Sequence, residues 1–236
     1  MRKGMNLSNT LSLVGVVLAL PGVLLLIFSD QMTIAVLVLL LAALVIGGAL
    51  GWRWHINQPA VTLLKAEKTL SFEDEQAHVS VVDYRLRIRA YHKGLQLFRL
   101  ANVSTDGSVG EIWLDGQRTT LSRISAGQGE VNKVFSGPLD RGQERDIRLW
   151  IQFFDSFDGP TQRWTHVVGH KTKRVSLKAQ FHPERPCKSV QAYLRYGGQV
   201  HRNLNEKASV SEDRCEVTLE LTRVRLGEEY TIEWDW

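Results

Sequence analysis

The sequence contains only two cysteines, Cys187 and Cys215, among 236 residues. Two thiols cannot build the disulfide framework of a small secreted scaffold, or a zinc site made of cysteine pairs. Catalytic motifs of fixed spacing are also missing: there is no Gly-x-Ser-x-Gly elbow, no phosphate loop ending in Gly-Lys-Ser/Thr and no His-Glu-x-x-His pair. The sequence therefore predicts no catalytic residue, no metal site, no cofactor and no enzyme activity.

Charge is nearly absent from the first quarter of the chain, where Asp30 is the only charged residue between Met5 and Trp52. Two apolar runs, residues 11–28 and 32–52, are each roughly long enough to cross a hydrocarbon core of about 30 Å as a helix. Because only three residues separate them, the sequence predicts a two-helix transmembrane hairpin. A cleaved signal peptide is the alternative for the first run, but it would not need a second apolar run directly after it.

The basic residues around this hairpin predict its orientation. They precede the first run and follow the second, whereas the connecting turn has none, so the positive-inside rule places both termini in the cytoplasm. The basic flanks are Arg2, Lys3, Arg53, Lys65 and Lys68.

Small residues recur every four positions in the second apolar run. Ala43, Gly47 and Gly51 form a small-xxx-small stripe that lets helices approach closely. The stripe is expected either to pack the two helices of one hairpin or to serve helix contacts between subunits.

The rest of the chain shows the period-two alternation of strands with one buried face. After a juxtamembrane stretch around residues 57–75, turn signals separate runs without a convincing amphipathic helix, which predicts an all-β cytoplasmic domain, a β-sandwich or barrel. The predicted domains are therefore 1–57, the membrane anchor and juxtamembrane segment, and 58–236, the β-rich binding domain. The clearest alternating runs are 84–88, 175–181, 217–221 and 230–236.

Arginines mark the most distinctive candidate binding surface. Arg85, Arg87 and Arg89 project from one face of one strand, and a second basic cluster includes Lys173 and Arg174. Guanidinium groups offer forked donors that suit phosphates, so these five residues are the predicted ligand-binding set. The alternatives are a solvated sheet face paired with acids of the neighbouring strand, or contact with anionic lipid headgroups. The net charge of +4 is too small to predict binding of polymeric nucleic acid.

Two further patterns are weaker. His166 and His170 are four residues apart, but the residues between them favour strand and turn, so they are expected to be structural or solvated and not to share a helical face as zinc ligands. Residues 155–159 resemble part of a calcium loop without its ligand spacing, and a turn is expected there.

A short two-span hairpin followed by a cytoplasmic β-rich domain resembles the two-transmembrane β-strand-rich effectors of bacterial antiviral signalling, found beside nucleotide cyclases in CBASS operons and in type III CRISPR systems. The resemblance implies a bacterial inner-membrane protein that contacts the lipid bilayer and assembles as a homo-oligomer. It also implies that the β-domain senses a cyclic oligonucleotide and then drives membrane disruption. The alternative function is a constitutive membrane-tethered scaffold whose β-domain binds proteins.

Overall fold

The structure is a computed structural model and describes residues 42–43, 60–125 and 128–236. The chain divides into two compact units, Met1–Gln58 and Pro59–Trp236. The strands that the structure describes belong to the second unit, so the fold described below is that of residues 59–236.

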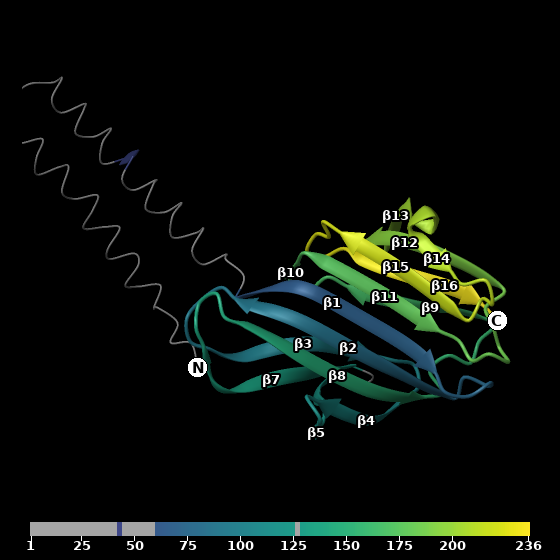
Figure 1. Ribbon diagram of the computed structural model, residues 1–236, viewed down its shortest axis with the longest axis horizontal. Helices are drawn as coiled ribbons and strands as arrows, with labels where there is room; N and C mark the ends of the chain where they lie inside the picture. Colours follow the sequence, from purple (N-terminus) through teal and green to yellow (C-terminus); the bar gives the residue numbers. More distant parts are fainter. Residues whose placement is uncertain (1–41, 44–59, 126–127) are drawn as a thin grey trace, which may run out of the picture. The chain divides into compact units, whose positions relative to one another are not determined.

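A nine-stranded sheet, called here the large sheet, is the main layer of the second unit (Figure 1). Its strands follow the order β14-β15-β11-β1-β2-β8-β4-β5, and β10 pairs beside β1. Pairing is antiparallel except where β1 runs parallel to β10 and β11. The strands are β1 (Val61–Phe72), β2 (Val79–Ala90), β4 (Ser108–Leu114), β5 (Gln117–Arg118), β8 (Glu144–Phe154), β10 (Lys171–Thr172), β11 (Arg174–Gln180), β14 (Ala208–Val210) and β15 (Glu216–Thr222).

Two smaller sheets accompany the large sheet. The four-stranded sheet has the order β13-β12-β16-β9, and the three-stranded sheet has the order β3-β7-β6. A single turn of 3₁₀ helix, Asn205–Lys207, precedes β14. The strands are β3 (Leu95–Ser104), β6 (Ser122–Ser125), β7 (Gln128–Leu139), β9 (Thr161–Val167), β12 (Ser189–Tyr196), β13 (Gln199–Asn203) and β16 (Glu229–Asp235).

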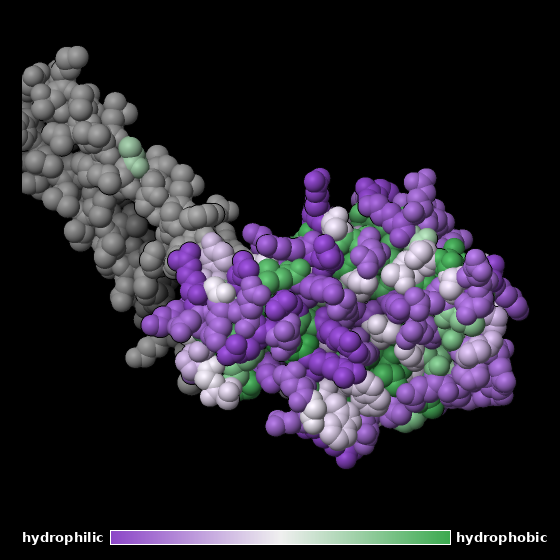
Figure 2. All heavy atoms as spheres, in the orientation of Figure 1, coloured by the Kyte–Doolittle hydropathy of each residue, from purple (hydrophilic) through white to green (hydrophobic). Residues whose placement is uncertain are grey.

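The large sheet has one buried face, called here the inner face. On β2, Tyr84, Leu86 and Ile88 are buried, whereas the arginines that alternate with them are exposed. Phe98 of the three-stranded sheet and Trp164 of the four-stranded sheet belong to the same hydrophobic core as these residues. Both small sheets therefore pack over the inner face. The opposite, outer face of β1, β2 and β8 is mostly hydrophilic (Figure 2).

The four alternating runs of the sequence correspond to β2, β11, β15 and β16, which confirms these strand predictions. The stretch around residues 57–75 differs from its prediction, because it contains β1, a central strand of the large sheet, and is not a juxtamembrane segment. A register shift between Leu63 and Lys65 interrupts the period-two pattern there. Such a bulge moves the following side chains to the other face and hides the strand from a simple alternation test.

The predicted fold class, a two-helix transmembrane hairpin plus an all-β domain, is wrong: the residues that the structure describes form a nearly all-β fold. Within the described residues the structure has no helix of the length and apolarity that a membrane crossing requires. The prediction of a multi-pass inner-membrane protein is wrong on the same finding. Apolar composition alone does not establish a span, because a span is also defined as a continuous helix of about 20 residues. The runs 11–28 and 32–52 lie outside the described residues, except for Ala42 and Ala43.

Candidate functional site: a lysine in the core face of the large sheet

Lys68 stands on the inner face of the large sheet. The strand register places it opposite Tyr84 of β2 on one side and Leu177 of β11 on the other. The same row continues to Leu149 of β8 and Leu219 of β15. Lys68 thus brings an ammonium group into a row of side chains that is otherwise uncharged.

Aromatic rings surround this ammonium group. Lys68 Nζ lies 5.7 Å from the centre of the Tyr84 ring and 5.2 Å from the centre of the Trp164 ring. These distances are within the range of cation–π attraction. Among the residues that the structure describes, Lys68 Nζ has no hydrogen-bond or ion-pair partner. Burial lowers the pKa of Lys68 to about 8, because a desolvated ammonium loses free energy when it keeps its charge.

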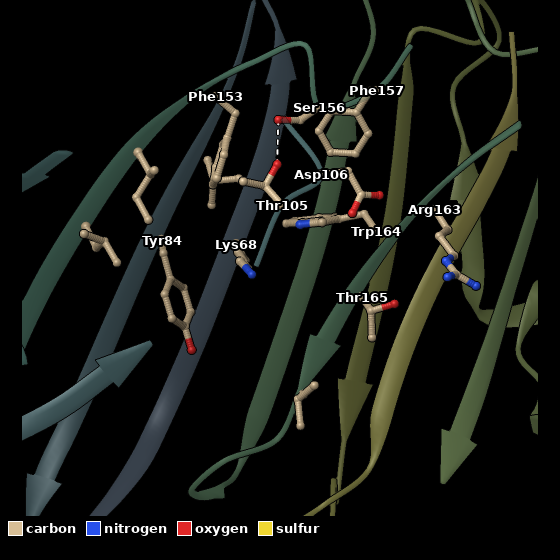
Figure 3. Close-up of a pocket in the computed structure, with 14 residues that line it drawn as sticks. Lys68, Tyr84, Thr105, Asp106, Phe153, Ser156, Phe157, Arg163, Trp164 and Thr165 are labelled. Carbon is tan, nitrogen blue, oxygen red and sulfur yellow. Dashed lines mark hydrogen bonds between the residues drawn. The ribbon is translucent and has the colours of Figure 1, made fainter. Parts of the chain in front are cut away.

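A cavity of about 450 Å³ opens over Lys68 (Figure 3). Its floor is the inner face of β1, β2 and β8, including the apolar side chains of Leu149, Ile151 and Phe153. Strand β9 of the four-stranded sheet forms one wall, and the turn after β3 contributes Thr105 and Asp106. The volume lies in the range of small-molecule sites, which are typically apolar with a few polar groups.

One hydrogen bond holds the turn after β3 against the loop that follows β8, and a second lies within the turn. Thr105 Oγ1 donates to Ser156 Oγ at 2.7 Å, and Gly107 N–H donates to Thr105 Oγ1 at 3.1 Å. A Cβ at Gly107 would lie 2.1 Å from the carbonyl oxygen of Phe154, so only glycine allows this approach. The close fit positions Asp106 at the cavity, with no hydrogen bond or ion pair to any described residue.

His166 belongs to β9 and packs its ring against Tyr84, with ring centres 6.1 Å apart. Burial, and secondarily the charge of Lys68, lowers the pKa of His166 to about 3. Burial raises the pKa of Tyr84. Both groups are therefore neutral at neutral pH, and Lys68 carries the one positive charge of this row.

The predicted arginine set lies elsewhere, on the outer face of β2, and each arginine faces carboxylates. Arg85 contacts Asp83 at 2.8 Å, and Arg148 of β8 contacts the same carboxylate at 2.9 Å. Arg87 lies 3.3 Å from Glu144 and 3.5 Å from Asp146. Arg89 Nε donates to Glu144 at 3.0 Å. This is the arrangement expected for a solvated sheet face, and ligand binding at the arginines stays a prediction.

The second predicted basic cluster lies partly on the same surface as the arginines of β2. The Arg89 hydrogen bond lowers the pKa of Glu144, and the charges of Arg87 and Lys173 add to this effect. Lys173 therefore belongs to the same charged surface as the β2 arginines. Arg174 begins β11, where it is paired in register with Thr222.

The remaining candidate residues do not form an enclosed site in the described part of the chain. His78, Asp155 and Asp158 cluster on the surface with exposed side chains, and His78 Nδ1 lies 2.9 Å from Asp155 Oδ1. Cys187 and Cys215 are free thiols. Of the predicted helix-packing stripe, Ala43 is helical and exposed, and Gly47 and Gly51 lie outside the described residues.

No protein-family model and no curated protein matches the chain. The similarity to known proteins is to solved structures. An M1 zinc metallopeptidase from Deinococcus radiodurans aligns with a TM-score of 0.41 and 11% identity, covering 74% of this chain and 42% of that one. Yeast LTA4 hydrolase in complex with bestatin aligns with a TM-score of 0.42 and 12% identity, covering 75% of this chain and 29% of that one.

This chain therefore spans about two fifths of the metallopeptidase that it resembles, and less of the hydrolase. Both of these solved structures are enzymes, and the prediction that this chain has no enzyme activity stays a prediction. At such scores they carry no argument about activity.

Proposed function

We propose that this chain is a binding protein for a small anionic ligand with an apolar or aromatic body, held in the cavity over Lys68. The observation that carries the proposal is the Lys68 ammonium, which faces a cavity of about 450 Å³ without a partner among the described residues. A ligand carboxylate, sulfonate or phosphate would supply the missing counter-charge. The apolar floor and Trp164 would cover the ligand's body.

The contrast with the outer face supports this choice of site. There, the arginines of β2 already have carboxylate partners, so an added anion would have to compete with Asp83, Glu144 and Asp146. The exposed pairs are also screened by water and salt. No carboxylate of the described residues forms an ion pair with Lys68, and its ammonium is less solvated than the exposed arginines, so an anion gains more from binding it.

The function expected from the sequence is a separate prediction, which no observation on this structure tests. Sensing of a cyclic oligonucleotide in antiviral defence, the alternative protein-binding scaffold and assembly as a homo-oligomer all stay predictions. The Lys68 proposal differs from the first in ligand size and in the face of the sheet that it uses.

The test uses a matched pair of probes, 1-naphthaleneacetate and its neutral amide, 1-naphthaleneacetamide. Binding of each to the full chain is measured by isothermal titration calorimetry. We expect the acid to bind at least about tenfold more tightly than the amide, since a charge-assisted contact is worth more than a neutral one. The preference should vanish in Lys68→Met, which keeps the length and apolarity of the stem.

Lys65→Met is the matched control, because Lys65 lies on the same strand with an exposed side chain paired to Glu67. It should leave the preference for the acid intact. Equal affinities of acid and amide in the wild-type chain, or an unchanged preference in Lys68→Met, would refute the proposal.

A further inference from the structure

Strand β9 is an edge strand at the wall of the Lys68 cavity. It pairs with β16 on one side, and in the described part of the chain no strand pairs with its other side. A free edge offers a row of unpaired N–H and C=O groups to an added strand.

The register of β9 and β16 identifies which residues carry these groups. Residue pairs in an antiparallel ladder alternate between those that exchange hydrogen bonds and those that do not. Val168 N–H donates to Glu228 O at 2.9 Å, and Trp236 N–H donates to Pro160 O at 3.1 Å. The even-numbered residues of β9 therefore bond to β16, and the backbone groups of Arg163, Thr165 and Val167 point to the free edge.

These same three residues line the Lys68 cavity. The free backbone groups of β9 thus lie along the opening that leads to the Lys68 ammonium. Lys68 Nζ is 5.2 Å from the ring of Trp164, which places the charge level with the middle of the strand. One opening therefore combines a strand template with a central cation.

We propose that the natural ligand of this site is an extended peptide segment that adds as a strand to the free edge of β9 and directs an Asp or Glu side chain at Lys68. This inference rests on the proposed function and names the ligand class of the same site. Recognition of this kind takes affinity from main-chain hydrogen bonds and specificity from alternate side chains.

The geometry also specifies the pattern of the peptide. At about 3.3 Å per residue, the edge from residue 162 to residue 166 accommodates about five residues. Side chains directly opposite each other in paired strands share a face, so the first, third and fifth residues, opposite Gln162, Trp164 and His166, face the cavity floor as Trp164 and His166 do. The third meets Lys68, and the first and fifth meet apolar side chains such as Leu149 and Phe153.

The probe is the peptide Ac-Val-Thr-Glu-Thr-Val-NH2, compared with the same peptide carrying Gln in place of Glu. Binding to the full chain is measured by calorimetry and by displacement of 1-naphthaleneacetate. We expect the Glu peptide to bind at least about tenfold more tightly than the Gln peptide and to displace the probe. In Lys68→Met the two peptides should bind equally.

Backbone recognition is tested with two N-methylated forms of the Glu peptide, one methylated at its two Thr residues and the other at its first and third residues. Because alternate N–H groups of an added strand face its neighbour, one form should lose binding and the other keep it. Val167→Pro removes one free-edge donor of β9 without removing a bond to β16, so the fold should persist. It should weaken the peptide more than Val167→Ile does.

Several results would overturn the inference. They are equal binding of the Glu and Gln peptides, equal binding of both methylated forms and the parent, or no binding of the Glu peptide at about 1 mM. If 1-naphthaleneacetate still binds through Lys68 in those cases, strand addition fails while the proposed function stands. If the naphthalene probe shows no dependence on Lys68, the proposed function itself fails.

Discussion

Lys68 and Trp164 come from different sheets, yet the ammonium nitrogen of one lies 5.2 Å from the ring centre of the other. Lys68 belongs to β1 in the middle of the large sheet, and Trp164 belongs to the edge strand of the four-stranded sheet. The charged site therefore exists only where the two sheets pack together. Its ligand-binding capacity should report on that packing as well as on the lysine.

Replacing Lys68 with Met should stabilise the fold at neutral pH. Burial lowers the pKa of Lys68 from 10.5 to about 8, so below pH 8 the folded chain holds a charge that folding disfavours. The difference between these values corresponds to about 3 kcal/mol. Urea unfolding of the full chain at pH 7 should show a higher midpoint for Lys68→Met. A lower midpoint would contradict the placement of Lys68 in an apolar row.

The same pair of chains should converge as the pH rises. Between pH 8 and 10.5 the unfolded wild-type chain binds a proton that the folded chain lacks, so wild-type stability increases with pH. Tyr84 and His166 face Lys68 and stay neutral in this range. The stability difference between Lys68→Met and wild type should therefore shrink from pH 7 to pH 10. A constant difference would show that Lys68 titrates normally.

His166 should make the fold sensitive to acid. Its pKa falls from 6.5 to about 3 on folding, mainly through burial and secondarily through the Lys68 charge. Between those values the unfolded chain binds the proton, so stability falls as the pH drops from 6.5 towards 3. His166→Phe lacks this proton uptake and should lose less stability over the same range. Parallel pH profiles of the two chains in urea unfolding would argue against a buried neutral His166.

Substitution on the arginine face should have small effects. Arg87→Gln removes contacts to Glu144 and Asp146 from a side chain that is 55% exposed. Exposed pairs of this kind contribute little, so the free energy of unfolding should change by under about 0.5 kcal/mol. Binding of 1-naphthaleneacetate should be unchanged, because the arginine points away from the cavity. Loss of that binding in Arg87→Gln would place the ligand on the outer face instead.

The strands with clean alternation were predictable from the sequence, and the site was not. In β2, Tyr84, Leu86 and Ile88 alternate with arginines, so both the strand and its buried side follow from period two. Lys68 shows no such signal, since the charged residues Lys65 and Glu67 precede it closely and a bulge shifts the register before it. From the sequence alone, Lys68 is one of the basic residues that follow the second apolar run and predict a cytoplasmic orientation. Only the pairing of β1 with β2 and β11 shows that this lysine faces the core.

The turn that closes the cavity should depend on the missing side chain of Gly107. A Cβ there would lie 2.1 Å from Phe154 O and 2.6 Å from Asp155 O, both of them backbone atoms that cannot swing away. Gly107→Ala should therefore displace the turn, break the bond from Thr105 to Ser156 and destabilise the fold by about 2 kcal/mol or more.

Gly137→Ala is the matched control, because nothing lies within 4 Å of a Cβ at that position of β7. Its urea midpoint should stay close to that of the wild-type chain, or rise slightly as the unfolded state loses entropy. Binding of 1-naphthaleneacetate should weaken in Gly107→Ala and persist in Gly137→Ala, since only the first variant moves Thr105 and Asp106 at the cavity. Equal binding and equal stability in both variants would mean that the turn after β3 is not a wall of the site.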